Sequence, residues 1–319
     1  MLRTFFVSLS HASWAQKTIS NWGFARRSAA RFIAGESISD AIQAVRQLNA
    51  AGINASLDHL GENTLDPAGA ERATGEIISI IEEIDRAGVR ANVSIKLSQI
   101  GLTLDEKVCQ LNLAKILAKA ASRGVFIRID MEDSTTTALT VQAVRQAFTS
   151  GHENVGLVIQ AYLRRSENDI RDLLQHPVRV RLCKGAYQEP AAIAYPQKAD
   201  VDANYDRLCR MLIEGALAAG SLRASADGRT PPIPAIATHD PARIENARKL
   251  IDKLGIARDA VEFQMLYGIR RDLQSQLASS GYPVRVYVPY GTQWYPYFMR
   301  RLGERPANIW FFLSNYFKR

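Results

Sequence analysis

Short apolar runs rich in β-branched residues alternate with longer amphipathic stretches along most of this chain. The stretches carry apolar residues at three-and-four spacing, and two of them, residues 70–88 and 108–124, end in glycine, a common helix stop. The strand-like runs begin at Asn54, Ala91, Val125, Asn154, Val178, Ile233, Val261 and Val284. Strands that alternate with helices predict a parallel sheet, and eight parallel strands close a TIM barrel. We therefore expect an α/β fold of the (β/α)8 class.

Residues 1–50 precede the first predicted strand and carry two helical patterns. We interpret this segment as an extension that adds N-terminal helices to the barrel. In the second pattern, residues 38–52, Ser39 and Asp40 belong to the residue types that cap helix N-termini.

The segment 220–234 is rich in serine, proline and glycine, a composition typical of loops. We expect it to be a surface loop before the sixth strand. No composition shift indicates a domain boundary after residue 50, so the predicted organisation is an extension, 1–50, and one catalytic barrel, 51–319.

The charge balance is basic, with a formal net charge of +8 and a pI near 9.5. Residues 1–35 contribute five of the basic residues and no acidic one. A basic, aromatic-bearing end of this kind is compatible with an anionic bilayer surface, with a transit peptide, or with a solvated helix of a basic enzyme. We expect a cytoplasmic protein that is peripheral on the inner face of the cytoplasmic membrane, and no nucleic-acid partner.

The three cysteines, Cys109, Cys183 and Cys209, are far apart and fit neither a disulfide framework nor a zinc spacing. We therefore expect a reducing compartment and no metal site. The sequence contains no run of about 18 apolar residues, the length that a transmembrane helix requires.

Polar residues gather at the ends of the predicted strands, where the active site of a barrel of this class lies. They are Asp58, Glu62, Lys96, Ser98, Asp130, Glu132, Asp133, Gln160, Arg181, Lys184, Thr238, His239, Glu262, Gln264 and Tyr287. A single inward charge is often part of a buried ion-pair layer. A set that comes from nearly every strand favours a binding site.

The cations of this set, with Arg300 and Arg301 from the "YPYFMRR" segment, indicate an anionic ligand. If that segment opens a helix, Tyr297 and both arginines share one side of it, so the pair can reach one carboxylate. The turn "KGA" at residues 184–186 follows the fifth strand and offers backbone N–H groups to a phosphate. No dinucleotide or Walker glycine motif accompanies it.

Two other functions fit parts of the same pattern. A Schiff-base lyase or aldolase would use Lys96 or Lys184 as the reactive amine at a strand end. A basic protein that binds membranes or nucleic acids without catalysis would explain the net charge but not the polar strand ends.

The combination of motifs resembles monofunctional bacterial proline dehydrogenases, which are flavoenzymes on a distorted (β/α)8 barrel. The similarity runs from about residue 31 to the end. It rests on "FIAGES", "LGEN", "SIKLS", "IDMED", "VIQAY", "VRLCKGAY", "ATHD", "EFQMLYG" and "VPYGTQWYPYFMRRLGE", in that order. The resemblance implies FAD as cofactor and oxidation of L-proline to Δ1-pyrroline-5-carboxylate, the first step of proline catabolism to glutamate.

The resemblance also implies a role for each matching residue. The substrate carboxylate would be held by Lys96, Arg300 and Arg301, with Tyr287 against the proline ring. Asp130 and Arg181 would be the catalytic residues, Arg181 lying against the flavin. Glu62 would pair with the first arginine when the site closes, and Glu304 would lie near the adenosine half of the cofactor. The implied FAD-binding residues are Met131, Gln160, Arg181, Lys184, Gly185, Ala186, Thr238 and His239.

The resemblance implies two partners besides L-proline. Electrons would pass to a membrane quinone, and the product would pass to a pyrroline-5-carboxylate dehydrogenase as a transient partner. Residues 1–30 match the family poorly and contribute little to this comparison.

Overall fold

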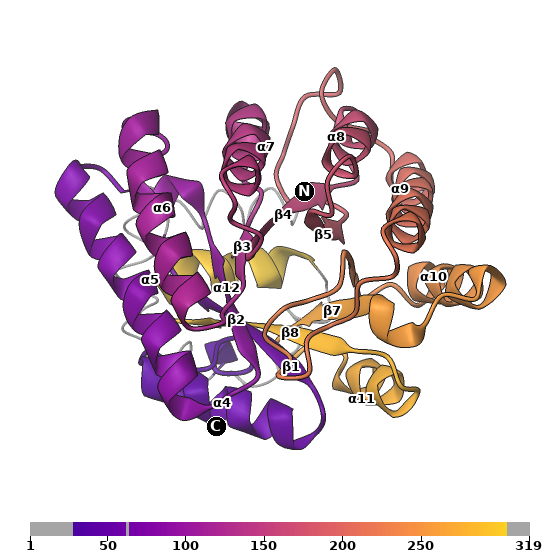
Figure 1. Cartoon of the computed structure of the whole chain (residues 1–319), viewed down its shortest axis with the longest axis horizontal. Coiled ribbons are helices and arrows are strands. Elements are labelled where there is room, and N and C mark those ends of the chain that lie inside the picture. Colours follow the sequence, from indigo (N-terminus) through magenta and orange to yellow (C-terminus); the bar gives the residue numbers. More distant parts are fainter. Residues whose placement is uncertain (1–27, 62–63, 305–319) are drawn as a thin grey trace.

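A computed structural model describes residues 28–61 and 64–304 (Figure 1). Its parallel strands pair in chain order and close into a barrel, which confirms the predicted fold class. The strands are β1 (Asn54–His59), β2 (Ala91–Ile95), β3 (Ile127–Ile129), β4 (Val155–Gln160), β5 (Arg179–Cys183), β6 (Pro234–Ala237), β7 (Glu262–Leu266) and β8 (Val284–Tyr290). Each lies within one of the predicted apolar runs.

A helix follows each strand, and all of these helices except the last cover the barrel from outside (Figure 1). They are α5 (Pro67–Ala87), α6 (Glu106–Ser122), α7 (Ser134–Thr149), α8 (Ser166–Leu173), α9 (Lys198–Ala218), α10 (Pro241–Leu254), α11 (Arg271–Ser279) and α12 (Trp294–Glu304), with 3₁₀ turns η1 (Leu97–Ile100) and η2 (Arg258–Ala260). Local signals set their ends: α5 starts where Asp66 accepts a hydrogen bond from the Gly69 N–H (2.6 Å) and stops at Gly88, whose φ is 63°.

Neither Ser39 nor Asp40, the two residues proposed as caps of the helix before β1, is its N-cap, although Asp40 takes part in the capping. Helix α4 (Ile38–Ala50) is capped by Ser37, whose hydroxyl accepts from the Asp40 N–H, while the Asp40 carboxylate accepts from the Ser37 N–H. Ser39 lies inside the helix, and Asp40 completes the capping box from the third helical position. Helix α4 packs against β1 and β8, so this part of the N-terminal segment covers the barrel wall.

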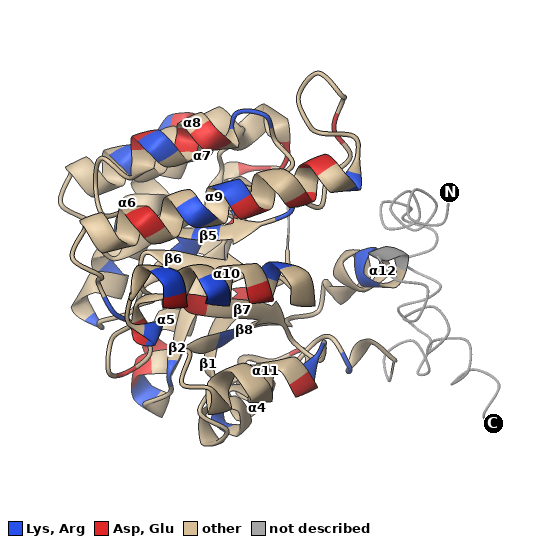
Figure 2. Cartoon of the chain, turned by 90° about the vertical axis from the view of Figure 1, so that its right-hand side faces the viewer, with Lys and Arg blue, Asp and Glu red and all other residues tan. Residues whose placement is uncertain are grey.

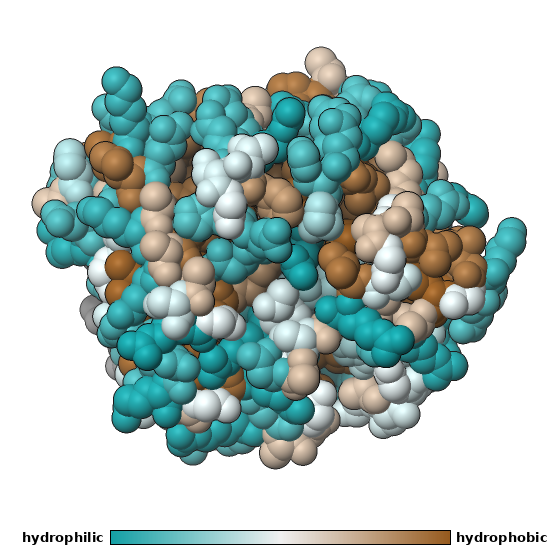
Figure 3. Space-filling view, viewed as in Figure 1, coloured by the Kyte–Doolittle hydropathy of each residue, from teal (hydrophilic) through white to brown (hydrophobic). Residues whose placement is uncertain are grey.

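The segment 220–234 is more than a surface loop. Gly228 is buried, and its carbonyl accepts a hydrogen bond from Arg285 inside the barrel (2.8 Å). Arg229 donates to the Arg123 carbonyl (3.0 Å). Figure 1 looks onto this end and shows the segment crossing in front of the strands; in the same view, side chains fill the centre of the face (Figure 3). The segment closes the amino-terminal end of the barrel. Its proline and glycine residues are explained by the tight turns that the chain makes there.

The opposite end of the barrel is crossed by α12 (Figure 2). Phe32 from the N-terminal segment packs against Phe298 of α12, with ring centroids 6.4 Å apart. The Ala34 N–H donates to the Pro289 carbonyl (2.9 Å), which fixes the chain before α4 to the end of β8. These contacts hold the helix that carries the arginine pair over the carboxyl ends of the strands. Within the described ranges, no helix is long and apolar enough to cross a bilayer.

Candidate active site

A cavity of about 650 Å³ opens at the carboxyl ends of the strands. Of the residues assigned a role from the sequence, it is lined by Lys96, Asp130, Met131, Gln160, Arg181, Lys184, Gly185, Ala186, Thr238, His239, Tyr287, Arg300 and Arg301. Glu62 and the side chain of Glu304 lie outside the described part of the structure, so their roles stay predictions. Residues that are separated by up to 205 positions along the chain (Lys96 and Arg301) thus share one cavity.

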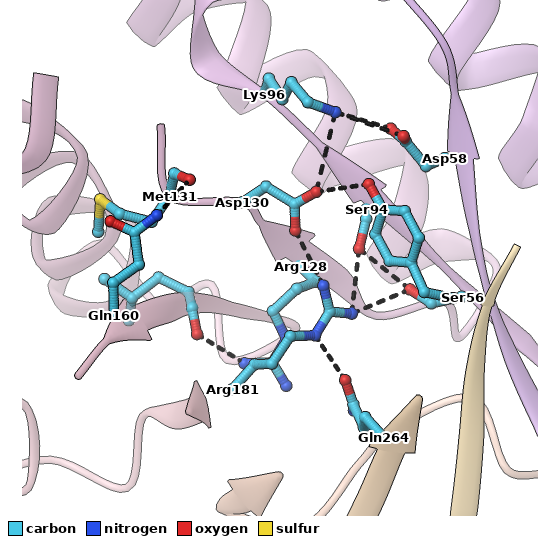
Figure 4. A network of polar contacts seen from close by, with 12 residues as sticks. Ser56, Asp58, Ser94, Lys96, Arg128, Asp130, Met131, Gln160, Arg181 and Gln264 are labelled. Atoms are coloured by element: carbon cyan, nitrogen blue, oxygen red, sulfur yellow. Dashed lines mark hydrogen bonds and ion pairs between the residues drawn. The ribbon is translucent and has the colours of Figure 1, made fainter. Parts of the chain in front are cut away.

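Asp130 is the central residue of the cavity floor (Figure 4). One carboxylate oxygen accepts from Arg181 Nη1 at 2.9 Å, and the other accepts from the Tyr287 hydroxyl at 2.8 Å. Lys96 Nζ lies 3.9 Å from the second oxygen. Asp130 therefore ties together three side chains, one from β5, one from β8 and one from the residue that follows β2.

Arg181 is held on almost every side by the barrel (Figure 4). Its Nε donates to Gln264 and its Nη2 donates to Ser56 (3.3 Å) and Ser94 (3.1 Å). A guanidinium has five N–H donors, and with the Asp130 bond four of them are used. The remaining donor is on Nη1, so the orientation of this cation is fixed before a ligand arrives.

Lys96 pairs with Asp58 at 3.1 Å, a shorter distance than to Asp130. Asp58 is only 1% exposed, and burial raises the pKa of its carboxyl, although the Lys96 charge opposes this. The sequence placed Asp58 at a strand end but gave it no role. A charged, ion-paired ammonium is a poor nucleophile, so this geometry does not favour a Schiff-base lysine at this position.

Lys184 is anchored in the same way by two carboxylates. Its Nζ donates to Asp202 on α9 and to Asp240 at the start of α10 (2.7 Å). Burial is the largest single cause and raises the pKa of both carboxyls, but the hydrogen bonds and charges of Lys184 and Lys198, with the backbone bond to Asp240, together lower both pKa values below the ordinary one. Asp240 also caps α10 by accepting from the Ala242 N–H (3.1 Å). The lysine is thus fixed beside the "KGA" turn by two carboxylates.

The turn after Lys184 depends on a glycine. Gly185 has a φ of 113°, a conformation that L side chains rarely adopt, and a Cβ there would lie 2.2 Å from the Tyr162 ring. The Tyr162 N–H donates to the Lys184 carbonyl (2.8 Å), which holds the turn against the end of β4. The backbone of Gly185 and Ala186 can therefore lie directly on the cavity wall.

Hydrogen bonds to the backbone fix the orientation of two further side chains on the cavity wall, Gln160 and His239. Gln160 donates from Nε2 to the Met131 carbonyl (3.3 Å), while its buried Oε1 has no hydrogen-bond partner among the described residues. His239 Nε2 accepts from the Leu266 N–H at 2.9 Å, so the proton of the neutral ring is on Nδ1. Gln160 therefore keeps a buried acceptor that no described residue uses, and His239 is locked in one tautomer.

The arginine pair lies on α12, as its spacing predicts. Arg301 is buried and its guanidinium carbon lies 5.1 Å from the centroid of the Tyr297 ring. Arg300 is partly exposed, and both arginines line the cavity with Tyr297. Cations from α12 and from β2 thus face one volume from two sides.

Neither thiol nor metal chemistry is supported by the described residues. Cys183 lines the cavity, but burial raises the pKa of its thiol to about 12, so it is protonated at neutral pH. No cluster of histidine, cysteine, aspartate and glutamate in residues 28–61 and 64–304 is suited to a metal ion.

Comparison with known proteins identifies the family. The family model described as "Proline dehydrogenase" matches residues 41–312. The curated proline dehydrogenase of Deinococcus radiodurans is 45% identical over 91% of this chain and 90% of its own length. Proline dehydrogenase 2 of Bacillus subtilis strain 168 is 40% identical over 97% of this chain and 96% of its own length.

A solved structure shows the same barrel. Proline utilization A (PutA) from Bdellovibrio bacteriovorus, inactivated by N-propargylglycine, superposes with a TM-score of 0.78 and 25% identity. The match covers 87% of this chain and 32% of that larger one. The order of the motifs, the contents of the cavity and these similarities agree: the chain belongs to the proline dehydrogenase family.

Proposed function

We propose that the chain binds FAD in this cavity and oxidises L-proline to Δ1-pyrroline-5-carboxylate, the first step of proline catabolism to glutamate. The observation that carries the proposal is the Asp130 cluster, which fixes Lys96, Arg181 and Tyr287 below an arginine pair from α12. A small zwitterion with one carboxylate and an apolar ring matches such a site, because cations surround the cavity while Tyr287 offers an aromatic ring.

The cavity residues fit a flavin nucleotide. The unused acceptor of Gln160 suits the imide N–H of a flavin ring, and the glycine turn beside Lys184 suits the pyrophosphate. Met131, Ala186, Thr238 and His239 complete the wall that would hold it. When bound, FAD supplies the two-electron acceptor that proline oxidation requires.

Lys96, Arg300 and Arg301 are the residues that we assign to the substrate carboxylate. They come from two elements on different sides of the cavity, so a carboxylate between them is held by both. The Tyr287 ring would pack against the proline ring, and its bond to Asp130 fixes its hydroxyl. Substrate binding therefore rests on a charge clamp and one aromatic wall.

The same residues favour the reactive form of the amine. The ring nitrogen of proline must be unprotonated for its lone pair to assist loss of hydride from the adjacent carbon. Fixed cations such as Arg181 and Lys96 disfavour an ammonium ion nearby, so the bound amine loses its proton more easily. Arg181 also places a preorganised positive charge where negative charge would develop on reduction.

We further propose a membrane quinone as electron acceptor and a pyrroline-5-carboxylate dehydrogenase as transient recipient of the product. Quinones dissolve in the bilayer, so the protein would meet its acceptor at the inner face of the cytoplasmic membrane. These assignments rest on the family resemblance rather than on a contact in the barrel.

The decisive experiment is an absorption spectrum of the purified protein, loaded with FAD, before and after anaerobic addition of L-proline. We expect the visible flavin band to be present and to bleach with L-proline. A colourless protein that does not take up FAD, and in which borohydride plus a 2-oxo acid such as pyruvate labels Lys96 or Lys184, would contradict the proposal and support the Schiff-base alternative.

Tyr287 offers a test of substrate packing. Replacing it with serine opens space and adds a hydroxyl next to the proline ring, so we expect the ratio of kcat/KM for hydroxyproline to that for proline to rise by about tenfold or more. Tyr287→Phe is the matched control, because it keeps the ring and loses only the 2.8 Å bond to Asp130. An unchanged ratio in Tyr287→Ser would show that the ring does not contact the substrate.

A further inference from the structure

Arg128 is an arginine inside the barrel that the proposed chemistry does not use. It is the middle residue of β3 and is 0% exposed. Its Nη1 donates to the carbonyls of Leu157 (3.0 Å) and Arg179 (2.5 Å), and its guanidinium carbon lies 4.9 Å from the centroid of the Phe126 ring. All these partners are uncharged.

No carboxylate in the described part of the chain lies within ion-pair distance of Arg128, and its Nε and Nη2 have no hydrogen-bond partner there. The other two interior arginines differ: Arg285 pairs with Glu262 at 2.9 Å, and Arg181 pairs with Asp130 at 2.9 Å. Burial first, and then the neighbouring Arg181, lowers the pKa of Arg128. A buried cation without a counter-ion is strongly unfavourable, so packing alone is a poor reason for it.

The fold leaves room for this side chain. Gly156 on β4 is the Cα partner of Arg128, and a Cβ at Gly156 would lie 2.9 Å from Arg128 Nη1 and 2.2 Å from the Arg179 carbonyl oxygen. The guanidinium can cross the neighbouring strand only because this position has no side chain. The position of the Arg128 side chain therefore depends on a glycine at position 156.

Arg128 lies next to the residues that hold Arg181. Ser94, its Cα partner on β2, accepts a hydrogen bond from Arg181 Nη2 (3.1 Å), and Figure 4 draws both arginines in the same part of the barrel, with no contact between them. Among the described residues, the interior arginines Arg128, Arg181 and Arg285 share two carboxylate partners, Asp130 and Glu262. Lys96 is balanced by Asp58, so the group carries one more positive than negative charge. Arg128, which carries the excess positive charge, lies below the floor of the cavity on the same side as Arg181.

We propose that Arg128 is a positioning residue whose uncompensated charge, acting beneath Arg181, favours the reduced and negatively charged form of the bound flavin. This inference rests on the proposed function, since it requires FAD in the cavity. A unit charge about 10 Å away, in surroundings of effective dielectric constant about 20, changes an equilibrium constant by roughly tenfold. The expected effect is therefore on the reduction equilibrium more than on binding.

The test is the midpoint potential of bound FAD, measured against a reference dye, in the FAD-loaded protein and its variants. In Arg128→Met, which removes the charge and keeps an unbranched apolar chain, we expect the ratio of reduced to oxidised FAD at a fixed potential to fall about tenfold, about 30 mV for two electrons. Arg128→Lys retains a charge and should stay within about threefold of the parent. Arg210→Met, at an exposed position of α9, is the control for total charge and should leave the ratio unchanged.

A second neutral variant, Arg128→Gln, keeps a donor for the Leu157 carbonyl and covers the case in which Arg128→Met does not fold. If a neutral variant binds FAD and its potential equals that of the parent, the inference is wrong, and a lower thermal midpoint would then show that Arg128 has only a structural role. If the parent protein itself binds no FAD, the proposed function fails independently of Arg128.

Discussion

Replacing Asp130 with alanine is expected to lower kcat/KM for L-proline by about two to three orders of magnitude. The carboxylate is 9% exposed and joins Arg181, Tyr287 and Lys96, so its loss leaves a buried arginine without its counter-ion. Breaking a buried pair from one side costs about 3–5 kcal/mol of stability, and loss of one preorganised polar group in an active site lowers kcat by about 10²- to 10³-fold. Steady-state kinetics with L-proline would measure the effect, mostly as a lower kcat.

The neighbouring Asp133 provides the matched control. It is exposed, caps α7 by accepting from the Thr135 N–H (3.0 Å), and does not line the cavity. Asp133→Ala should cost about 1 kcal/mol of stability and leave kcat/KM unchanged. Asp130→Asn keeps the shape and one acceptor, so its activity should lie between those of the parent and Asp130→Ala. Parent-like activity in Asp130→Ala would remove Asp130 from the mechanism.

The fold was predictable because barrel strands have a strong local signature. The run 155–159 is apolar on both faces, as a strand buried between a barrel interior and surrounding helices can be. The same reasoning failed for 220–234, where composition indicated a loop but could not show that Gly228 lies under the barrel. Composition reports local backbone preferences, whereas burial of a loop depends on contacts with distant strands.

The sequence predicted which residues line the site better than it predicted the hydrogen bonds and ion pairs between them. Lys96, Arg181 and Tyr287 stood out as polar residues at strand ends, and the carboxyl ends of all strands meet at one mouth. The sequence did not indicate that Asp58 would be the nearest partner of Lys96, since that pairing depends on barrel register. Arg128 carried a weaker signal: it alternates with apolar residues within a strand, which places it on the interior side.

Replacing Gly185 with alanine is expected to weaken FAD binding by about 10- to 100-fold. The backbone at this position has a φ of 113°, and the added Cβ would lie 2.2 Å from the Tyr162 ring, which is itself buried. Strain of this kind costs about 1–3 kcal/mol, and the turn can relieve it only by moving away from the wall beside Lys184. Titration of the apoprotein with FAD, followed by flavin fluorescence, would measure the loss.

Gly75→Ala is the control for glycine replacement as such. Gly75 lies in the middle of α5, where a Cβ would meet no atom within 4 Å, so alanine there should raise helix stability by up to about 1 kcal/mol and leave FAD affinity unchanged. If Gly185→Ala retained the parent's FAD affinity while folding normally, the turn after β5 would not contact the cofactor. Weaker FAD binding with an unchanged thermal midpoint of the apoprotein would instead show that the ligand requires the glycine. The turn of the apoprotein could then relax the strain, and the strain would weaken binding only because the turn must lie against the pyrophosphate.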